Sequence, residues 1–475
     1  MAIPNHDHWI GGPCRPKDGE YFDVLNPLDD SLYARAAKGS VDDIRHAVQT
    51  AGDAFSTYRD SLPKEREAWL IRAAELLQQQ ADEFVEILID EIGSPITKAQ
   101  REVATATGLL RAAAGATRKL SGKTMPTDIP GRMSLSVRRP LGVIAGVTPF
   151  NVPLIKGVKH AAMPLATGNT FVLLPSEDSP VIAIRLARLF ADAGIPDGVF
   201  NVVTGRGAEI GDALTTHGDV RMVGFTGSTR VGKHVRSLCG LHGKRVTLEM
   251  GGKNPLIVLQ DANIAKAVMG SVVGSFLYQG QICMAASRIY VHDRVYDEFV
   301  ERFAAAASAL GQGDLRDPKT MIGPIINDRQ RQRVRAHLDD AIEKGAQVAA
   351  GGQWQDHRCQ PTVLTDVTDG MTLCKAETFG PVTAVYRVES ADEALRRAND
   401  SEYGLSASVY TADLANAMRF AEDLQAGMVH INGTTVQEEA HVPFGGVGES
   451  GFGRESTDTD IEDMTQWKWI TIQYA

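Results

Sequence analysis

A cysteine and a glutamate stand in surroundings suited to covalent catalysis. Cys283 follows a Gly-Gln turn in the stretch 279–284 (Gln-Gly-Gln-Ile-Cys-Met), and Glu249 precedes a glycine pair in the stretch 247–253 (Thr-Leu-Glu-Met-Gly-Gly-Lys). A thiolate is a strong nucleophile and a carboxylate is a general base, so the pair is suited to act across a cleft. Taken alone, each has an ordinary explanation, because a single buried cysteine is usually an inert packing residue and a single glutamate is usually a surface charge.

Further motifs accompany this pair in a consistent order along nearly the whole chain. They are 148–153 (Thr-Pro-Phe-Asn-Val-Pro), 225–229 (Phe-Thr-Gly-Ser-Thr), 248–253 (Leu-Glu-Met-Gly-Gly-Lys), 279–283 (Gln-Gly-Gln-Ile-Cys), 377–381 (Glu-Thr-Phe-Gly-Pro) and 443–446 (Pro-Phe-Gly-Gly). In this combination the sequence resembles the aldehyde dehydrogenase superfamily. The resemblance implies oxidation of a small-molecule aldehyde by a nicotinamide cofactor, which needs a nucleophile because a free aldehyde is a poor hydride donor.

The resemblance implies catalytic roles for three residues. Cys283 forms a thiohemiacetal that becomes a thioester, and Glu249 activates the water that cleaves it. Asn151, which alone would be an ordinary turn residue, donates its amide to the oxyanion beside the backbone N–H of Cys283. Relatives that pass the acyl group to coenzyme A generally lack the glutamate, so Glu249 favours a free acid as product. Glu455, in a Gly-Arg-Glu stretch, is the reserve candidate for the base.

The motifs also imply where the cofactor binds. Ser228 opens a helix, where its hydroxyl and nearby backbone amides can meet the pyrophosphate, and an N-cap role is compatible with this. Glu177 stands where a carboxylate accepts from a 2′-hydroxyl and repels a 2′-phosphate, which favours NAD, with NADP as the alternative. At Leu174 the family usually has a lysine that bonds the ribose, and a leucine cannot. The predicted cofactor-binding residues are Thr148, Pro149, Phe150, Glu177, Gly207, Gly211, Phe225, Gly227, Ser228, Gly232, Met250, Glu377 and Phe379.

Two further regions bear on the substrate. Residues 274–284 and 429–437 look most like the bacterial branch of benzaldehyde, salicylaldehyde and vanillin dehydrogenases. In that branch a basic residue commonly lies eight places after the oxyanion asparagine, and here that place is Lys159. A cation there can meet a phenolate or a ring hydroxyl; the alternative is a surface lysine on an amphipathic helix. The predicted substrate residues are Lys159, Leu277, Tyr278 and Thr434.

Two other interpretations of the function stay open at this point. Within enzymes, the chain would be a semialdehyde or aliphatic aldehyde dehydrogenase. Outside enzymes, it would be a non-catalytic protein that kept the fold, against which the intact Cys283, Glu249 and Asn151 count. A panel of aromatic and aliphatic aldehydes separates these interpretations.

The composition narrows the class of protein. A net charge of −10 and a pI near 5.7 argue against a nucleic-acid or anionic-membrane binder. The five cysteines include no Cys-x-x-Cys pair, which disfavours a disulfide framework or a metal site and fits a reducing cytoplasm. Residues 1–9 carry no signal-peptide core, and no apolar run of about 18 residues occurs, so neither export nor membrane insertion is expected. The basic stretch 329–335 is expected to be a solvated helix face.

Apolar periodicity predicts the elements that must position these side chains. Between residues 141 and 251, short apolar runs alternate with segments of helical period, which is typical of βαβ units and a doubly wound parallel sheet. A second α/β pattern follows residue 254, and helices are expected over 41–55, 64–92 and 98–118. Alternating residues at 133–137 and 467–474 predict a hairpin and a C-terminal strand that must be paired.

The predicted fold class is therefore α/β. It has a doubly wound parallel-sheet NAD-binding domain (1–118 and 139–248), a second α/β catalytic domain (249–445) and a small β oligomerisation element (119–138 and 446–475). The resemblance implies that this element builds a homodimer or a homotetramer.

Overall fold

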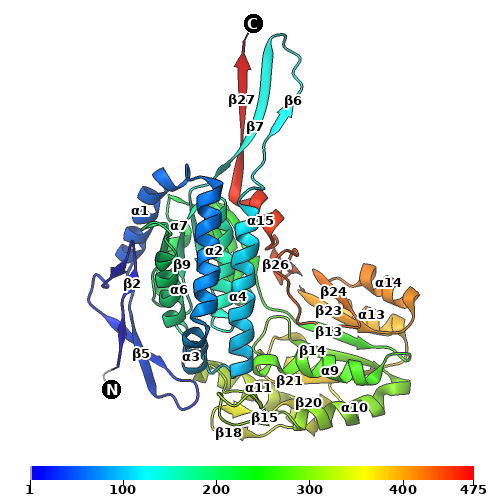
Figure 1. Ribbon diagram of the computed structural model, residues 1–475. Helices are drawn as coiled ribbons and strands as arrows, with labels where there is room; N and C mark the ends of the chain where they lie inside the picture. The colour runs from blue at the N-terminus through cyan, green and yellow to red at the C-terminus, as the bar shows by residue number, and fades with distance from the viewer. Residues whose placement is uncertain (1–2, 475) are drawn as a thin grey trace.

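The computed structural model describes residues 3–474 and contains two α/β bodies with a β-ribbon that projects away from them (Figure 1). The first body is built on an eight-stranded sheet with the order β26-β12-β11-β8-β9-β10-β2-β3. Its parallel strands are β8 (Val143–Val147), β9 (Thr170–Leu174), β10 (Phe200–Val202), β11 (Val220–Thr226) and β12 (Arg245–Glu249). The antiparallel additions are β2 (His8–Trp9), β3 (Pro13–Cys14) and β26 (Gly451–Phe452).

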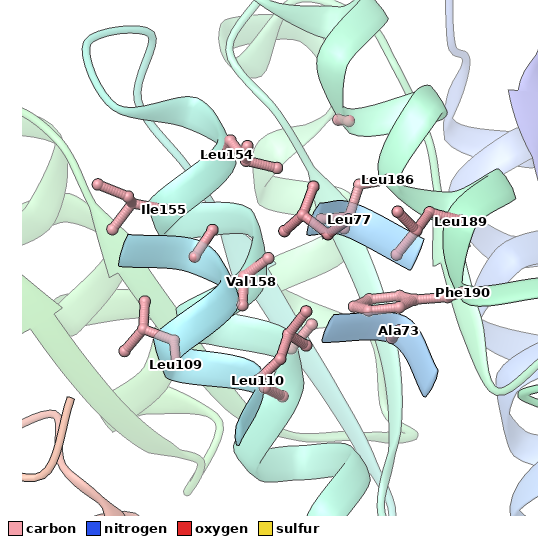
Figure 2. Close-up of a cluster of buried hydrophobic side chains, with 14 of the residues drawn as sticks. Ala73, Leu77, Leu109, Leu110, Leu154, Ile155, Val158, Leu186, Leu189 and Phe190 are labelled. Carbon is pink, nitrogen blue, oxygen red and sulfur yellow. The ribbon is translucent and has the colours of Figure 1, made fainter. Parts of the chain in front are cut away.

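Helices cover both faces of this sheet because its strands are apolar on both sides. One core joins Ile144, Phe171 and Leu173 to helices on one face, and a separate core joins Val143 and Val172 to helices on the other. The first face carries α2 (Pro63–Gln79), α3 (Ala81–Ile92), α4 (Ile96–Ala116), α5 (Pro153–Ala166) and α6 (Pro180–Asp192), and the second carries α1 (Val41–Tyr58), α7 (Gly207–Thr216) and α8 (Thr229–Leu241). Figure 2 shows the first core where α2, α4, α5 and α6 meet. The predicted doubly wound fold is confirmed.

The second body contains a seven-stranded sheet with the order β17-β20-β21-β14-β13-β23-β24, parallel except for the β17–β20 pair. The strands are β13 (Asn254–Val258), β14 (Ala286–His292), β17 (Gln347–Ala350), β20 (Thr362–Thr365), β21 (Val382–Val388), β23 (Ser406–Tyr410) and β24 (Met428–Ile431). The helices of this body are α9 (Ile264–Phe276), η1 (Leu277–Gly280), α10 (Asp293–Ser308), α11 (Asp328–Glu343), α12 (Thr372–Lys375), α13 (Ala391–Asn399) and α14 (Leu414–Asp423).

The projecting ribbon joins distant parts of the chain. In it β27 (Thr465–Gln473) runs antiparallel to β7 (Arg132–Pro140), which also pairs with β6 (Lys123–Met125). The predicted hairpin and paired C-terminal strand are confirmed. The remaining short elements are β1 (Asn5–His6), β4 (Tyr21–Leu25), β5 (Leu32–Ala37), β15 (Gly311–Gln312), β16 (Thr320–Ile322), β18 (Trp354–Gln355), β19 (Arg358–Cys359), β22 (Tyr403–Gly404), β25 (Val447–Gly448) and α15 (Thr457–Met464).

Three predictions need correction. The helix expected over 64–92 is two helices, because Gln80 leaves helical geometry (φ −104°, ψ 19°). The segment 446–475 does not all belong to the ribbon, since β26 pairs with β12 of the first sheet and α15 packs on α4 and α5. The basic stretch 329–335 is not wholly solvated, because Arg331 is buried and paired with Asp30 at 2.8 Å.

Within residues 3–474, no helix is both long enough and apolar enough to cross a membrane.

Candidate active site

The predicted site residues follow neighbouring strands of the first sheet. Residues 148–152 follow β8, Glu177 follows β9, Ser228 follows β11, and Glu249 ends β12. Because these strands are parallel, their carboxyl ends meet at one edge. The strand order also places β8 between β9 and β11. The chain runs from β8 to β9 and β10 on one side of β8 and then crosses to β11 and β12 on its other side. Ligands of doubly wound sheets bind at such a switch point.

Cys283 lies on a turn with an unusual backbone. Tyr278, Gln279 and Gly280 have φ angles of 49°, 44° and 68°, so three successive residues are left-handed. Left-handed geometry costs an L-residue roughly 1–2 kcal/mol. A Cβ on Gly280 would lie 2.2 Å from the carbonyl oxygen of Gly380, so this position has no room for a side chain.

Side-chain amides hold this turn from both sides. The Gln279 amide donates to the Pro324 carbonyl (2.9 Å), and the Gln281 side-chain oxygen accepts from the Ile326 backbone N–H (3.1 Å). The Asn254 amide donates to the carbonyl of Cys283 itself at 2.8 Å. The half-buried thiol of Cys283 is therefore presented by an anchored backbone.

Asn151 is brought to the same turn from the other body. It is 4% exposed, and its side-chain amide donates to the Gln281 carbonyl at 2.9 Å. The tertiary structure thus places the predicted oxyanion donor beside the turn that carries Cys283, although the two residues lie far apart in the sequence.

Glu249 is a buried carboxylate whose oxygens have no hydrogen-bond partner among the described residues. Burial, followed by repulsion from Glu455, raises the pKa of Glu249 well above its usual range, and Lys156 and Lys159 oppose this shift. A Cβ on Gly445 would lie 2.6 Å from Oε1 of Glu249, so the glycine leaves space for this carboxylate. A buried carboxylate with free lone pairs and a raised pKa has the properties of a general base.

Glu455 lies in the same cluster with the opposite surroundings. Its carboxylate meets Lys156 Nζ at 2.7 Å, Lys159 Nζ at 3.5 Å and His160 Nε2 at 3.3 Å. Burial alone would raise the pKa of Glu455, but the lysine ammonium groups offset this and hold it well below its usual range. A carboxylate so fully paired is a poor proton acceptor, which argues against Glu455 as the base.

The surroundings of Cys283 favour the thiol over the thiolate. Burial raises the pKa of Cys283 to about 12; Lys156 lowers it, and Glu377 and Glu249 raise it further. Forming the thiolate therefore requires a nearby proton acceptor. Glu249 is a carboxylate without a hydrogen-bond partner among the described residues, and it lies near enough to raise the pKa of Cys283.

The residues predicted to hold the pyrophosphate lie at the start of α8. Ser228 is its exposed N-cap residue, and its hydroxyl makes no cap hydrogen bond. Phe225 and Met250 pack under the first turn, where a Cβ on Gly232 would lie 2.4 Å from the Met250 sulfur. A Cβ on Gly227 would likewise lie 2.7 Å from the Phe225 ring. The open helix terminus and its uncapped hydroxyl fit an anionic pyrophosphate.

The residues predicted near the nicotinamide come from both bodies. Phe150 and Phe379 meet edge to face with ring centroids 5.9 Å apart. Glu377 accepts from the Gly252 backbone N–H at 3.1 Å, and burial raises its pKa to about 7. Thr148 donates its backbone N–H to the Leu174 carbonyl (3.2 Å), and Pro149 follows it on the same loop.

The residues predicted to bind the adenosine side of the cofactor are one carboxylate and two glycines. Glu177 is half-buried on the loop after β9, while Leu174 is fully buried in the core beneath it. Gly207 and Gly211 lie at the start of α7, and a Cβ on Gly207 would meet nothing within 4 Å. These residues fit a dinucleotide, with Glu177 as the carboxylate for the ribose and no lysine at position 174.

Two predicted substrate residues are not placed as expected. Tyr278 is fully buried and donates its hydroxyl to the Ile92 carbonyl at 2.8 Å, so it cannot touch a substrate. Lys159 is neither on the surface nor free: its ammonium pairs with Glu438 and with Glu455 and lies 4.3 Å over the Phe444 ring. Leu277 and Thr434 are half-buried, and their assignment to the substrate stays a prediction.

Lys156 is a charged residue of the site that the sequence motifs do not identify. It is 3% exposed, lies one turn before Lys159 on α5, and approaches both Glu249 and Cys283 closely enough to change their pKa values. The signal was present, since every residue of α5 is buried and a lysine pair in so apolar a helix must find anionic partners.

These features combine a buried candidate nucleophile and an unpaired buried carboxylate with a doubly wound fold of the kind that binds nucleotides. The family model described as "Aldehyde dehydrogenase family" matches residues 14–470, and the chain belongs to that family. Aldehyde dehydrogenases oxidise small-molecule aldehydes with NAD(P).

Known proteins resemble the chain over nearly its whole length. It is 40% identical to a vanillin dehydrogenase of Pseudomonas fluorescens, covering 98% of this chain and 97% of that protein. It superposes with a TM-score of 0.96 on a salicylaldehyde dehydrogenase of Pseudomonas putida G7 complexed with salicylaldehyde, at 37% identity over 99% of this chain and 98% of that one. A betaine aldehyde dehydrogenase of Staphylococcus aureus in complex with NAD+ gives a TM-score of 0.95 at 29% identity over 99% and 95% of the two chains.

Proposed function

We propose that this chain oxidises an aromatic aldehyde to the free carboxylic acid, with NAD as the hydride acceptor. The observation that carries the proposal is the contrast within the buried cluster, where Glu249 keeps both oxygens unpaired and Glu455 is fully paired. The names of the relatives support the aromatic class. The carboxylate of Glu177 supports NAD over NADP, because it would repel a 2′-phosphate.

The first half of the reaction forms the thioester. Glu249 takes the proton of Cys283, and the thiolate attacks the aldehyde carbon to give a thiohemiacetal. The Asn151 amide and the Cys283 backbone N–H donate to the oxyanion. Residues 225–232, Glu377 and Phe379 would hold the cofactor, whose nicotinamide would accept the hydride that leaves the thiohemiacetal carbon as the thioester forms.

The second half releases the acid. Glu249 first releases the proton of Cys283 to solvent. It then accepts a proton from a water molecule while the oxygen of that water attacks the thioester carbon, and the Cys283 sulfur leaves with this proton returned to it. Because the water has a base of its own, coenzyme A is not needed as an acceptor.

Spectrophotometry of NADH formation tests the proposal. Benzaldehyde, hydroxybenzaldehydes, vanillin, succinic semialdehyde and a short aliphatic aldehyde are compared with NAD and with NADP, with and without coenzyme A. We expect the highest kcat/KM for the aromatic aldehydes with NAD, a free acid as product, no acceleration by coenzyme A and no NADH from Cys283→Ala. A clear preference for the semialdehyde or the aliphatic substrate would overturn the aromatic assignment. No turnover with any aldehyde would support a non-catalytic protein.

We also propose that the chain forms a homodimer or a homotetramer through the ribbon of β6, β7 and β27. The ribbon carries exposed apolar side chains, including Trp469 at 67% and Ile472 at 47% exposure. A narrow ribbon is marginally stable without a partner surface, which supports an interface there.

A further inference from the structure

Lys98 is a buried charge that the reaction described above does not use. It lies near the start of α4, is 6% exposed and forms an ion pair with Glu102 one turn later on the same helix. Neither residue belongs to the motifs that carry the chemistry. A buried ammonium is costly unless its protons are all matched, so its partners indicate what it holds in place.

The partners of Lys98 belong to both halves of the active site. Its Nζ donates to the backbone carbonyl of Asn151 at 2.8 Å and lies 4.1 Å from the centroid of the Tyr278 ring. Together with the Glu102 carboxylate, these contacts account for the three N–H donors of an ammonium group. Lys98 thus lies between the loop of the oxyanion donor and the turn of the nucleophile.

Glu102 extends the same contact to the helix that follows Asn151. Its second oxygen accepts from the backbone N–H groups of Leu154 (2.9 Å) and Ile155 (3.3 Å) and so caps the start of α5. The packing of α4 on α5 continues below this cap through Leu109, Leu110 and Val158 (Figure 2). The oxyanion loop therefore has a rigid base.

The nucleophile turn needs such support because its backbone is strained. Tyr278 and Gln279 are both left-handed and both fully buried, so native contacts must outweigh their conformational cost. The Tyr278 hydroxyl is held by Ile92, and its ring faces Lys98. A cation over an aromatic face is attracted by the negative charge of the ring face, and more strongly in a desolvated site. The Asn151 amide closes the ring of contacts by donating to the Gln281 carbonyl.

From these contacts we infer that Lys98 is a positioning residue that fixes the Asn151 amide relative to the Cys283 thiol by holding the Tyr278 turn against the Asn151 loop. It touches neither substrate nor cofactor. This inference rests on the proposed function, in which Cys283 is the nucleophile and Asn151 donates to the oxyanion. Misplacement of a reacting group by about 1 Å costs up to roughly a hundredfold in rate, so loss of Lys98 acts mainly on kcat.

The test compares Glu102→Gln with the double variant Lys98→Met/Glu102→Gln in the full-length protein. Glutamine keeps an oxygen for the cap of α5 and removes the carboxylate that Lys98→Met alone would leave buried and unpaired. Arg101→Met, on the exposed face of the same helix, is the control for charge removal. We expect the double variant to lose about tenfold to a hundredfold in kcat relative to Glu102→Gln, with KM for NAD unchanged within about twofold.

Two further measurements separate positioning from general destabilisation. The first is the rate at which iodoacetamide alkylates Cys283, followed by mass spectrometry of its peptide without aldehyde or NAD; we expect it to change in the double variant but not in Arg101→Met. The second measurement adds Tyr278→Leu. As a single substitution in the wild type it should lower kcat, but in the double variant it should cause little further loss, because the contact between Lys98 and the Tyr278 ring is already gone.

Equal kcat and equal alkylation rates in Glu102→Gln and the double variant would overturn the inference, as would fully additive losses with Tyr278→Leu. A wild-type protein that oxidises no aldehyde overturns the proposed function instead. In that case the alkylation rates still decide whether Lys98 positions the turn.

Discussion

At the scale of single residues, Glu249 and Glu455 show how surroundings separate chemically identical groups. Both are buried in one cluster, but Glu455 is paired with Lys156 while Glu249 has no hydrogen-bond partner among the described residues. Their pKa values are pushed in opposite directions, upward for Glu249 and downward for Glu455. Such a split is the physical basis for assigning a base and a fixed anion to two carboxylates.

Replacing Glu249 by glutamine should separate the two halves of the reaction. The Cys283 thiol can also lose its proton to solvent, whereas the attacking water depends on Glu249, so Glu249→Gln should still form the thioester and then hydrolyse it roughly a hundred- to ten-thousandfold more slowly. Stopped-flow measurement should show a burst of NADH near one equivalent of enzyme before a slow steady state. A slow rate without a burst would mean that the Cys283 thiol depends on Glu249 for loss of its proton as strongly as the water does.

The cluster also predicts two opposite pH shifts. Glu249 must be ionised to act, so activity should rise with pH through its pKa. Lys156→Met removes a cation that lowers the pKa of Glu249, and should move the acidic limb of the kcat profile to higher pH. Glu455→Gln removes an anion that raises this pKa, and should move the limb to lower pH. The other charges in reach, Lys159 and Arg454, are unchanged in both variants. Shifts in the same direction would contradict this electrostatic account.

Lys159 provides a third test at this scale. Its ammonium is already paired with Glu438 and Glu455, so it has no unmatched charge to offer a phenolate. We therefore expect Lys159→Met to lower kcat/KM for benzaldehyde and for hydroxybenzaldehydes by similar factors, through the packing of Phe444 and the cluster. A selective loss of at least about tenfold for the hydroxylated substrates would restore the direct contact predicted from the sequence, since a charged hydrogen bond contributes about 1.5–3 kcal/mol.

At the scale of elements, buried glutamates connect helices that the sequence pattern treats separately. Glu102 of α4 caps α5, and Glu91 of α3 caps α6 by accepting from the backbone N–H groups of Val181 (2.5 Å) and Ile182 (3.0 Å). Free N–H groups at a helix start need such acceptors when they are buried. These caps fix the helices that follow β8 and β9, and so fix the loops that carry Asn151 and Glu177.

Removal of the α6 cap should lower the free energy of unfolding without changing the groups that carry out the reaction. Glu91→Ala leaves two buried N–H groups without an acceptor, and each unsatisfied group costs about 1–3 kcal/mol. Glu86→Ala, on the same helix, breaks only a half-exposed ion pair with Arg316 and should cost no more than about 1 kcal/mol. Chemical denaturation of both variants measures the difference. A loss of stability in Glu91→Ala no larger than in Glu86→Ala would contradict the capping role.

At the scale of the whole molecule, the ribbon is the part that the two bodies do not cover (Figure 1). Trp469 donates its indole N–H to the Ser134 hydroxyl at 2.9 Å, yet the residue is 67% exposed. Tyr474, which follows β27, is 69% exposed. Large aromatic side chains on a projecting sheet fit burial against another copy of the chain.

The ribbon therefore predicts the oligomeric state. The wild type should run as a dimer or a tetramer in size-exclusion chromatography with light scattering. Trp469→Asp combined with Ile472→Asp places charges on the exposed ribbon and should shift the protein to a smaller species. Asp substitutions at Leu414 and Met418, which are equally exposed on α14, serve as the control and should leave the assembly intact. An unchanged mass in the ribbon variant would contradict this interface.

Local sequence was sufficient for the class of fold and for the main chemical groups. Apolar runs of strand length separated by helical periods predicted β8 to β12, because burial on both faces imposes that pattern on the sequence. Cys283, Glu249 and Asn151 were found because their motifs are short and contiguous. The break at Gln80 was not predicted, since the apolar stripe runs through it without interruption and no Gly or Pro marks it.

The tertiary structure alone decided how the buried charges are paired. Lys156 and Glu455 lie 299 residues apart, and Lys159 and Glu438 lie 279 apart, so no local pattern relates them. The same holds for the contact of Lys98 with Asn151, 53 residues away, and for the burial of Tyr278 against Ile92. Periodicity reports which face of an element is apolar, whereas the pKa of a buried group depends on which charges the fold brings within a few ångströms of it. For that reason the sequence supplied the candidate groups, and only the folded chain showed which of the two carboxylates lacks a hydrogen-bond partner among the described residues.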